Sequence, residues 1–302
     1  MRITVVTTTL NAMPYIADTT RSVLQSTYSD LEYMIIDAGS CDGTLEYLRS
    51  LSDSRVQLHV RKGSGPYEAV DWGFRHATGD VHAWLNGDDL YYPGTISSVA
   101  QLFTEFPDVQ WITGLPSFVD AEGRCTMVAV PSSYPRRYIA NGWFTPSVFG
   151  SLIQESMFWR RGLYERAGGL DLGYELAADF ELWTRFARYA PLVAVNTLLA
   201  AWRKHGSNRS VTMRSMYLED VERATKDLPH ITPFKRWLCR CEQARHVLRL
   251  AEWHRTPYIY FSMTDSRWRL CTGFRPISRY SFQQLRMEYR ATRERARRIP
   301  HF

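Results

Sequence analysis

A regular alternation of short apolar runs and amphipathic segments over residues 3–85 constrains the fold of this chain more than any other feature. The apolar runs have the length of strands, and between them apolar residues recur at helical spacing. Strands joined by helical crossovers pair in parallel with right-handed connections. The pattern therefore predicts an α/β fold, with strands at residues 3–8, 32–36, 56–60 and 81–85 and helices at residues 14–25, 45–51 and 67–77.

Length and composition fit a globular protein with one large α/β domain and a smaller appendage. The 302 residues are 45% hydrophobic and 14% aromatic, which gives ample material for a core. The sequence shows no secretory leader and no apolar run of the ~18 residues that a membrane-spanning helix needs, so we expect a cytoplasmic protein. The 5 cysteines are scattered without paired spacing, which predicts reduced thiols instead of disulfides or a zinc cluster.

Two adjacent aspartates, Asp88 and Asp89, directly follow the apolar strand at residues 81–85. Two carboxylates at one strand end repel each other unless a positive charge lies beside them. A hard divalent cation with oxygen ligands meets that need and also binds a substrate diphosphate. The pair also fits solvated turn residues ahead of a helix that starts near Pro93 and Gly94.

Other polar residues follow the first and second strands. The carboxyl ends of parallel strands meet along one edge of the sheet, where ligands of open α/β sheets bind. This rule brings Thr9, Asn11 and Asp37 to the edge that holds the acidic pair. A carboxylate such as Asp37 can accept hydrogen bonds from a base or a ribose, or can stabilise its own turn. Phosphate-loop ATPases and dinucleotide dehydrogenases fit poorly, because neither of their glycine-rich motifs is present.

Four sequence blocks together resemble the family 2 glycosyltransferases with the GT-A fold. The resemblance extends to about residue 210, and it implies a Rossmann-like GT-A domain over residues 1–215 that binds a nucleotide-diphosphate sugar. The blocks are residues 7–11 (TTTLN), 37–44 (DAGSCDGT), 65–74 (GPYEAVDWGF) with 77–80 (ATGD), and 85–89 (LNGDD).

The resemblance assigns a role to each strand end. It implies that the base and ribose of the donor are held by Thr9, Asn11, Asp37 and Ser40. It also implies that Asp88 and Asp89 form the DxD-type motif, which binds Mn²⁺ or Mg²⁺ on the donor diphosphate. Two departures leave the nucleotide sugar open, with UDP favoured: Gly63 stands where the family often has aspartate, and residues 68–71 (EAVD) replace Asp-Ala-Met-Asn.

A later block, residues 177–186, again resembles the family and follows a strand predicted at residues 154–161. There the resemblance assigns the general base of an inverting enzyme to Asp179. Glu181 is the competitor, but residues two apart on a helix do not share a face, and Glu181 has Arg185 four residues on as a partner. Asp179 also fits a plain helix N-cap.

Residues 202–210 (WRKHGSNRS) follow the last predicted core strand and carry a histidine that similar family members use to reach the metal or the diphosphate. The resemblance therefore predicts His205 as a metal ligand, with Arg203, Lys204 or Arg209 beside phosphate oxygens. A histidine among basic residues also fits an ordinary surface position.

Two further segments allow alternative interpretations. Aromatic residues between residues 131 and 151 fit either stacking on sugar rings or ordinary packing. Beyond about residue 216 the family pattern fades, and arginine becomes dense within a net charge of +6. Residues 216–302 are predicted to form a basic helical extension, with helices at residues 234–254 and 280–298. Such helices bind an anionic membrane surface or pack with their arginines in water, and the second arrangement is slightly favoured.

These features predict metal-dependent inverting transfer of a hexosyl or N-acetylhexosaminyl group to a saccharide or lipid-linked saccharide acceptor. Similar proteins assemble polysaccharides or glycolipids, which suits a cytoplasmic protein peripheral to the inner face of the membrane. One alternative is a sugar nucleotidyltransferase, although residues 9–13 lack its glycine-rich, lysine-bearing loop. The other is a non-catalytic nucleotide-sugar-binding scaffold, which has no need of Asp88, Asp89 and Asp179. Nucleic acid is not an expected partner, and an oligomer is left open.

Overall fold

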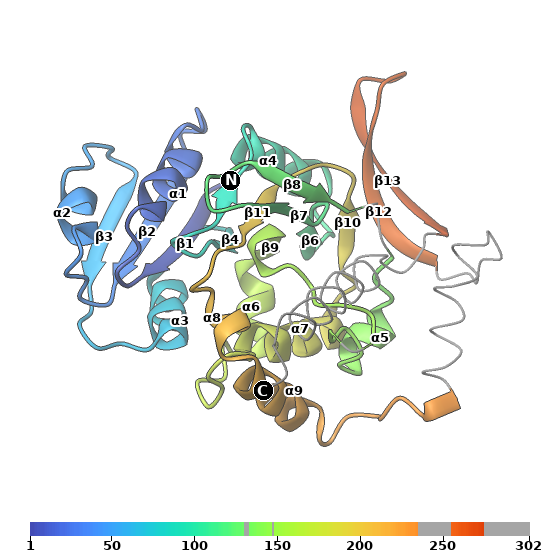
Figure 1. Ribbon diagram of the computed structural model, residues 1–302. Coiled ribbons are helices and arrows are strands. Elements are labelled where there is room, and N and C mark those ends of the chain that lie inside the picture. Colours follow the sequence, from blue (N-terminus) through green and yellow to red (C-terminus); the bar gives the residue numbers. More distant parts are fainter. Residues whose placement is uncertain (130–132, 147, 235–254, 275–302) are drawn as a thin grey trace, which may run out of the picture.

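The amino-terminal half of the main sheet is the parallel unit that the apolar pattern predicted. In the computed structural model shown in Figure 1, which describes residues 1–129, 133–146, 148–234 and 255–274, four strands pair in parallel in the order β4-β1-β2-β3. Thr9 lies opposite Asp37, at the carboxyl ends of neighbouring strands. The strands are β1 (Ile3–Thr9), β2 (Leu31–Asp37), β3 (Val56–Val60) and β4 (Val81–Trp84), and the helices between them are α1 (Tyr15–Leu24), α2 (Thr44–Arg49) and α3 (Pro66–His76).

The sheet continues beyond β4 with mixed pairing. β9 (Met157–Arg160) runs antiparallel to both β4 and β6 (Trp111–Thr113), and β10 (Val193–Val195) runs parallel to β6. Most of the strand pairs in the sheet are parallel, so the α/β fold with a mostly parallel sheet is confirmed. The later helices beside it are α4 (Thr95–Glu105), α5 (Arg136–Ala140), α6 (Arg161–Ala167) and α7 (Ala178–Tyr189).

Successive side chains of a strand point to opposite faces of the sheet, and a hydrophobic core lies on each face. Val5 belongs to a buried cluster that includes Ile16 of α1 and Phe103 of α4. Its neighbour Val6 belongs to a second cluster that includes Trp183 of α7. Helices therefore cover both faces, and the carboxyl ends of the strands are left as the place for a site.

A second, four-stranded sheet joins two segments that are far apart in the sequence. β5 directly follows the acidic pair, and β11 ends two residues before His205; Ala201 pairs with Leu90 between them. This pairing brings residues 88–89 beside residues 203–205. The strand order is β5 (Leu90–Tyr91), β11 (Ala200–Arg203), β7 (Ser117–Val119) and β8 (Cys125–Val128).

The aromatic residues between residues 131 and 151 pack into the core. Tyr134, Trp143, Phe144 and Phe149 are all buried and belong to the same hydrophobic cluster as Trp159. The ring centroids of Phe144 and Phe149 are 5.7 Å apart. Of the two arrangements that the sequence allows, ordinary packing is the one these side chains adopt.

Part of the predicted helical extension is instead a hairpin of the main sheet. β12 (Arg255–Ser262) runs parallel to β10 and antiparallel to β13 (Arg267–Phe274). Ile259 is fully buried there, in a segment whose aromatic and branched residues suit a strand. The helical prediction is therefore wrong for these two strands.

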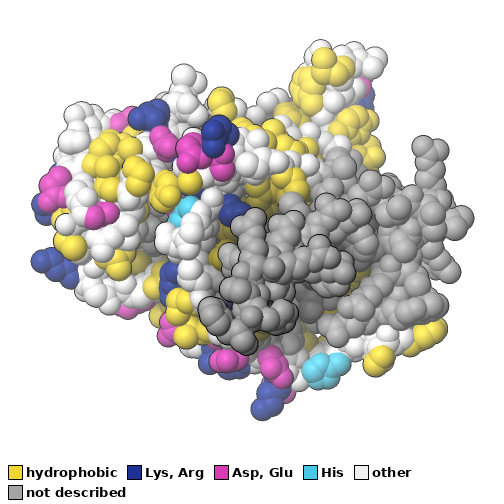
Figure 2. All heavy atoms as spheres, viewed as in Figure 1, with side chains coloured by type: hydrophobic (Ala, Val, Ile, Leu, Met, Phe, Trp, Pro, Cys, Tyr) yellow, Lys and Arg dark blue, Asp and Glu magenta, His cyan; other side chains and the backbone are white. Residues whose placement is uncertain are grey.

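The hairpin projects beyond the rest of the sheet in Figure 1, and Figure 2 shows hydrophobic side chains gathered on it. Met263 is 84% exposed near its turn, and Phe261 and Leu270 are also exposed. The predicted helices at residues 234–254 and 280–298 lie outside the described residues, except for the first residue of the former. No helix in the described part of the chain is long and apolar enough to cross a membrane.

Candidate active site

Four residues predicted to bind the donor lie together at the ends of β1 and β2 and are here called the Asp37 corner; Asn11, Asp37 and Ser40 are joined by hydrogen bonds. Asp37 is fully buried, and its carboxylate accepts hydrogen bonds from the backbone N–H groups of Gly39 (2.9 Å) and Ser40 (2.8 Å). The Ser40 hydroxyl donates to Asp37 (2.5 Å) and accepts from the Asn11 backbone N–H (2.8 Å). Thr9 faces Asp37 in the strand register. Asp37 thus stabilises its own turn, and the structure brings the other three predicted residues together around it.

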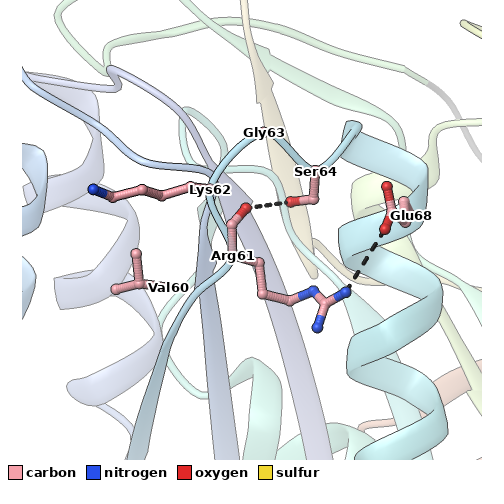
Figure 3. A pocket seen from close by; sticks show the side chains of 6 residues that line it. All are labelled: Val60, Arg61, Lys62, Gly63, Ser64 and Glu68. Atoms are coloured by element: carbon pink, nitrogen blue, oxygen red, sulfur yellow. Dashed lines mark hydrogen bonds and ion pairs between the residues drawn. The ribbon is translucent and has the colours of Figure 1, made fainter.

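A hollow of about 270 Å³ opens beside this corner, in the loop between β3 and α3 (Figure 3). The loop is tied to the corner because the Arg61 backbone N–H donates to the Asp37 carbonyl (2.8 Å). The Arg61 guanidinium lies 4.8 Å from the centroid of the Trp72 ring and 3.7 Å from the Glu68 carboxylate. In Figure 3, Arg61 points toward Glu68 and Lys62 points the other way. The hollow is lined by Val60, Arg61, Lys62, Gly63, Ser64 and Glu68.

The backbone of this loop accounts for one departure from the family pattern. Gly63 has a φ of 76°, a left-handed conformation that residues with a side chain rarely adopt. An aspartate would be strained in this backbone. A family member with aspartate at this position therefore needs a different loop backbone.

A close approach of two loops brings the acidic pair to the end of β1. A Cβ atom on Gly87 would lie 3.0 Å from Thr9 Oγ1 and 3.3 Å from the Thr8 carbonyl. Such contacts are tighter than nearly all contacts that Cβ atoms make, so glycine at this position favours the close approach. Asp88 and Asp89 consequently lie next to the Asp37 corner.

The two aspartates have different surroundings. Asp89 is 1% exposed, and its carboxylate accepts hydrogen bonds from the Arg203 backbone N–H (2.8 Å) and from Asn86 Nδ2 (3.1 Å). Burial, together with the negative charges of Glu155 and Asp88, raises the pKa of Asp89 well above its usual range. Asp89 thus joins the acidic loop to β11, and each of its oxygens accepts one hydrogen bond from the protein.

Asp88 is partly exposed and lies against His205. His205 Nε2 is 2.9 Å from Asp88 Oδ2, and the histidine ring stacks on Tyr15 with centroids 4.6 Å apart. Asn208 accepts a hydrogen bond from the His205 backbone N–H (2.7 Å), which holds the loop in place. Asp88 and His205, which were both predicted to bind the metal, thus place one carboxylate and one imidazole side by side.

This pair fits a hard divalent cation with few protein ligands. Among the described residues, no group of three or more His, Cys, Asp or Glu side chains is arranged to hold a metal. Mg²⁺ typically takes one or two carboxylates together with substrate phosphates and waters. Asp88 and His205 fit such a site, whereas Asp89 is directed to protein donors.

Arg203 stabilises the acidic loop from inside. Its side chain is 0% exposed, and its guanidinium donates to the Asp88 carbonyl (2.8 Å), the Ala121 carbonyl (2.7 Å) and the Asp18 carboxylate (3.2 Å). The guanidinium carbon also lies 5.0 Å from the centroid of the Tyr15 ring. Arg203 is consequently not available to a phosphate, in contrast to the prediction, while Lys204 and Arg209 are exposed.

Glu155 is a site residue that the sequence analysis missed. It lies in a short 3-10 helix, η1 (Gln154–Ser156), which replaces the start of the predicted strand, and it is 5% exposed. Burial raises its pKa to about 7; a hydrogen bond with Asp89 opposes this, and the charges of Asp179 and Asp88 add to it. The acidic pair and the predicted base thus both act on Glu155. The sequence feature that could have indicated this site residue was an acidic residue next to an otherwise apolar strand.

Asp179 occupies the first turn of α7. The N-cap of this helix is Ala177, so the N-cap role considered for Asp179 is wrong. Burial raises the pKa of Asp179 to about 6, against the effect of backbone N–H groups at the helix start. Glu181 is held by Arg185, with Nε 2.7 Å from Oε1, as the sequence predicted.

The predicted residues therefore lie along one edge of the sheet. The Asp37 corner contacts the acidic loop through Thr9 and Gly87. The acidic loop interacts with Glu155, and Glu155 interacts with Asp179. Acidic residues more than 140 positions apart in the sequence are joined by this chain of neighbours.

Comparison with known proteins identifies related sequences. The family described as Glycosyl transferase family 2 matches residues 4–162. An uncharacterized glycosyltransferase of Nostoc sp., alr2836, is 23% identical over 283 residues, which cover 88% of this chain and 85% of that protein. The uncharacterized glycosyltransferase RC0461 of Rickettsia conorii is 22% identical over 202 residues, or 66% of this chain and 33% of that protein. The chain thus spans about a third of the length of some relatives.

Solved structures share the fold. S. aureus TarS (residues 1–349, in complex with UDP-GlcNAc) has a TM-score of 0.59 at 13% identity, covering 83% of this chain and 74% of that chain. The mannosyltransferase PcManGT from Pyrobaculum calidifontis, in complex with GDP-Man and Mn²⁺, has a TM-score of 0.57 at 19% identity, covering 82% and 72%. At such identities the likeness concerns the fold alone, and it confirms the GT-A fold that the sequence predicted.

Proposed function

This chain belongs to glycosyl transferase family 2, and on that premise we propose that it transfers a sugar from a nucleotide-diphosphate sugar to an acceptor hydroxyl with inversion at the anomeric carbon. The observation that carries the proposal is the convergence of the Asp37 corner, the Asp88–His205 pair and Asp179 on one sheet edge. Ligands of open α/β sheets bind at this edge.

The donor is a UDP-linked hexose or N-acetylhexosamine bound at the Asp37 corner. The unused lone pairs of Asp37 and the side chains of Thr9, Asn11 and Ser40 contact the base and ribose. The diphosphate extends toward Asp88. The two neighbours of similar fold, whose complexes contain UDP-GlcNAc and GDP-Man, support a nucleotide-sugar donor, and the TarS complex supports UDP in particular.

Asp88 and His205 hold the divalent cation, Mn²⁺ or Mg²⁺. When bound, the cation stabilises negative charge on the leaving diphosphate. Asp89 accepts hydrogen bonds from the Arg203 backbone and from Asn86, so its role is to fix the loop that presents Asp88. The Mn²⁺ in the PcManGT complex supports a metal requirement.

Asp179 is the general base. The acceptor oxygen attacks the anomeric carbon from the face opposite the diphosphate, its proton passes to the Asp179 carboxylate, and the bond from the anomeric carbon to the phosphate oxygen breaks. The nucleoside diphosphate leaves with the bonding electrons. With a pKa of about 6, Asp179 is mostly ionised at neutral pH and can accept a proton. This pKa is also close enough to 7 for the carboxylate to be an effective general base.

The acceptor is a saccharide or a lipid-linked saccharide in polysaccharide or glycolipid assembly. Residues 1–215 form the transferase domain, and residues 216–302 add contacts to an anionic membrane surface. The exposed Met263 and Phe261 of the β12–β13 hairpin, with Arg267 and Arg269 nearby, suit such a surface.

A donor screen tests this function. Thermal unfolding of the purified chain is measured with UDP-, GDP- and dTDP-sugars, each with and without Mn²⁺, and nucleotide release is followed in the same samples. We expect one nucleotide class to raise the midpoint only with metal and to be turned over. Stabilisation without turnover for any sugar of that class, with or without saccharide acceptors, would identify a binding scaffold.

A further inference from the structure

A helix beyond the family match packs directly on the segment that carries the proposed base. α9 (Arg214–Thr225) starts 52 residues after the matched region ends at residue 162. Val221 of α9 forms a small buried cluster with Ala177 and Phe180, and Tyr217 packs against that cluster. Ala177 and Phe180 lie on either side of Asp179 along the chain. The helix therefore forms one wall beside Asp179.

Asp220 fastens α9 to the loop that leads into α7. Its carboxylate is 6% exposed and accepts hydrogen bonds from the backbone N–H groups of Glu175 (2.8 Å) and Leu176 (2.7 Å). Arg223 extends this attachment, because it donates to Asp220 (2.8 Å) and to the Gly173 carbonyl (2.6 Å). These bonds fix the position of α9 relative to the start of α7, and thus the position of Tyr217 relative to Asp179.

Two tyrosines from different helices pack against the segment that carries Asp179. Tyr67 lies against the core cluster that contains Ala178, and Tyr217 lies against the cluster of Ala177 and Phe180. The negative charge of Asp179 acts on both Tyr67 of α3 and Tyr217 of α9. Burial raises the pKa of Tyr67 well above its usual range, so its hydroxyl keeps its proton and can donate it. Burial likewise raises the pKa of Tyr217, so its hydroxyl also keeps its proton. Helices from distant parts of the chain thus each supply one tyrosine beside the Asp179 segment.

The Tyr67 side has an additional unsatisfied donor. Its ring packs edge-on against Trp84, with centroids 5.6 Å apart. Trp84 is 4% exposed, and within the described part of the chain its Nε1–H has no hydrogen-bond partner. Buried donors are normally paired. A ligand with several hydroxyl groups is the kind of molecule that satisfies phenol and indole donors together.

We propose that Tyr67 and Tyr217 form the two walls of a subsite for the acceptor pyranose, in which their hydroxyls bind sugar hydroxyls and direct one of them at Asp179. The inference rests on the proposed transferase function and identifies the acceptor at this subsite as a sugar ring. It also gives α9 a role, since Asp220 holds Tyr217 in place. Tyr217 and Asp220 are specificity and positioning residues respectively.

Acceptor binding can be measured apart from donor binding. The full chain, loaded with UDP and Mn²⁺, is examined by saturation-transfer NMR against methyl glycosides of glucose, galactose, mannose and N-acetylglucosamine. We expect at least one glycoside to bind the wild type, and its affinity to fall about tenfold or more in Tyr217→Phe and in Tyr67→Phe, because a hydrogen bond in a site built for a hydroxyl is lost. Asp220→Asn is expected to weaken the same glycoside.

The control is Tyr189→Phe, which removes a hydroxyl from an exposed tyrosine at the far end of α7. It should leave glycoside affinity unchanged. The UDP-dependent rise in the unfolding midpoint should be equal in all variants, which separates the acceptor subsite from the donor site. Binding of no glycoside, or equal binding by wild type and both active-site Phe variants, overturns this inference alone. Failure of UDP, GDP and dTDP to stabilise the wild type overturns the proposed function and this inference with it.

Discussion

His205 Nε2 lies 2.9 Å from Asp88 Oδ2, although the two residues are 117 positions apart in the sequence. The contact depends on pairing between β5 and β11, which brings the acidic loop and the histidine loop together. The surrounding groups are already occupied: Asp89 binds the Arg203 backbone, and Arg203 binds the Asp88 carbonyl. The metal proposal therefore concerns this particular pair.

Replacement of His205 by alanine tests the pair. We expect the apparent Kd for Mn²⁺ to rise about tenfold or more, because one of two protein ligands is lost. The effect on Mg²⁺ should be smaller, since Mg²⁺ depends more on oxygen ligands. Free Mn²⁺ is measured by electron paramagnetic resonance in the presence of UDP. His76→Ala, at an exposed histidine of α3, is the control. Unchanged Mn²⁺ affinity in His205→Ala contradicts the assignment.

Arg203→Met tests the interior support of the acidic loop. The guanidinium is fully buried, and its loss leaves the Asp88 and Ala121 carbonyls without their donor. We expect a loss of about 2–4 kcal/mol in the free energy of unfolding. Urea denaturation of this variant and of Lys204→Met, at the exposed neighbouring position, provides the measurement. Equal stabilities of the two variants would show that Arg203 does not support the loop.

Gly87→Ala tests the close approach between the acidic loop and β1. The added Cβ meets Thr9 Oγ1 at 3.0 Å and the Thr8 carbonyl at 3.3 Å, so the loop must shift. We expect weaker UDP binding, by about tenfold, and a stability loss of about 1–2 kcal/mol. Isothermal titration and urea denaturation measure the two effects. Gly162→Ala, where a Cβ meets no atom within 4 Å, is the control and should weaken neither UDP binding nor stability. If Gly87→Ala behaves like this control, the close approach of the acidic loop to β1 is contradicted.

The pH dependence of transfer tests Asp179. Burial raises the pKa of Asp179 to about 6, and only the carboxylate can accept a proton. The value of kcat/KM should rise about tenfold per pH unit below pH 6 and level off above it. A profile that is flat between pH 5 and about pH 7 would exclude Asp179 as the base.

The same shift predicts the opposite trend for stability. Because the folded state holds the proton more tightly, the contribution of Asp179 is fully present below about pH 3.9, the pKa of an unfolded aspartate, and is lost as pH rises through about 6. The wild type should therefore lose stability relative to Asp179→Asn between about pH 4 and about pH 6. Parallel stability curves for the two proteins would contradict the shift.

The sequence predicted those features that depend on local pattern. Strands and helices of the parallel half lie within two residues of their predicted bounds. The rule that the carboxyl ends of parallel strands meet at one edge also correctly predicted that Thr9 and Asp37 lie together. Features that depend on distant pairing were not predictable in this way. Burial of Asp89 depends on a backbone group 114 residues away, and the same pairing buries Arg203.

The carboxyl-terminal segment shows a second limit. Residues 255–274 form strands because β12 pairs with the edge of β10. The periodicity of these residues does not indicate which strand they pair with. Glu155 was missed for a related reason. The segment that contains Glu155 has the apolar character of a strand, but it begins with a 3-10 helix. Glu155 interacts with Asp89, which is far away in the sequence.

The central claim is that Asp88 binds the donor through its metal while Asp179 serves only the chemical step. Two measurements on the wild type, Asp88→Asn and Asp179→Asn separate these roles. They are the affinity for the nucleotide sugar that the donor screen identifies and the rate at which nucleoside diphosphate is released from it, both at saturating Mn²⁺. We predict that Asp179→Asn binds donor like the wild type but turns it over about 10²-fold or more slowly, whereas Asp88→Asn loses both. Wild-type turnover by Asp179→Asn, or wild-type donor affinity in Asp88→Asn, would contradict the account.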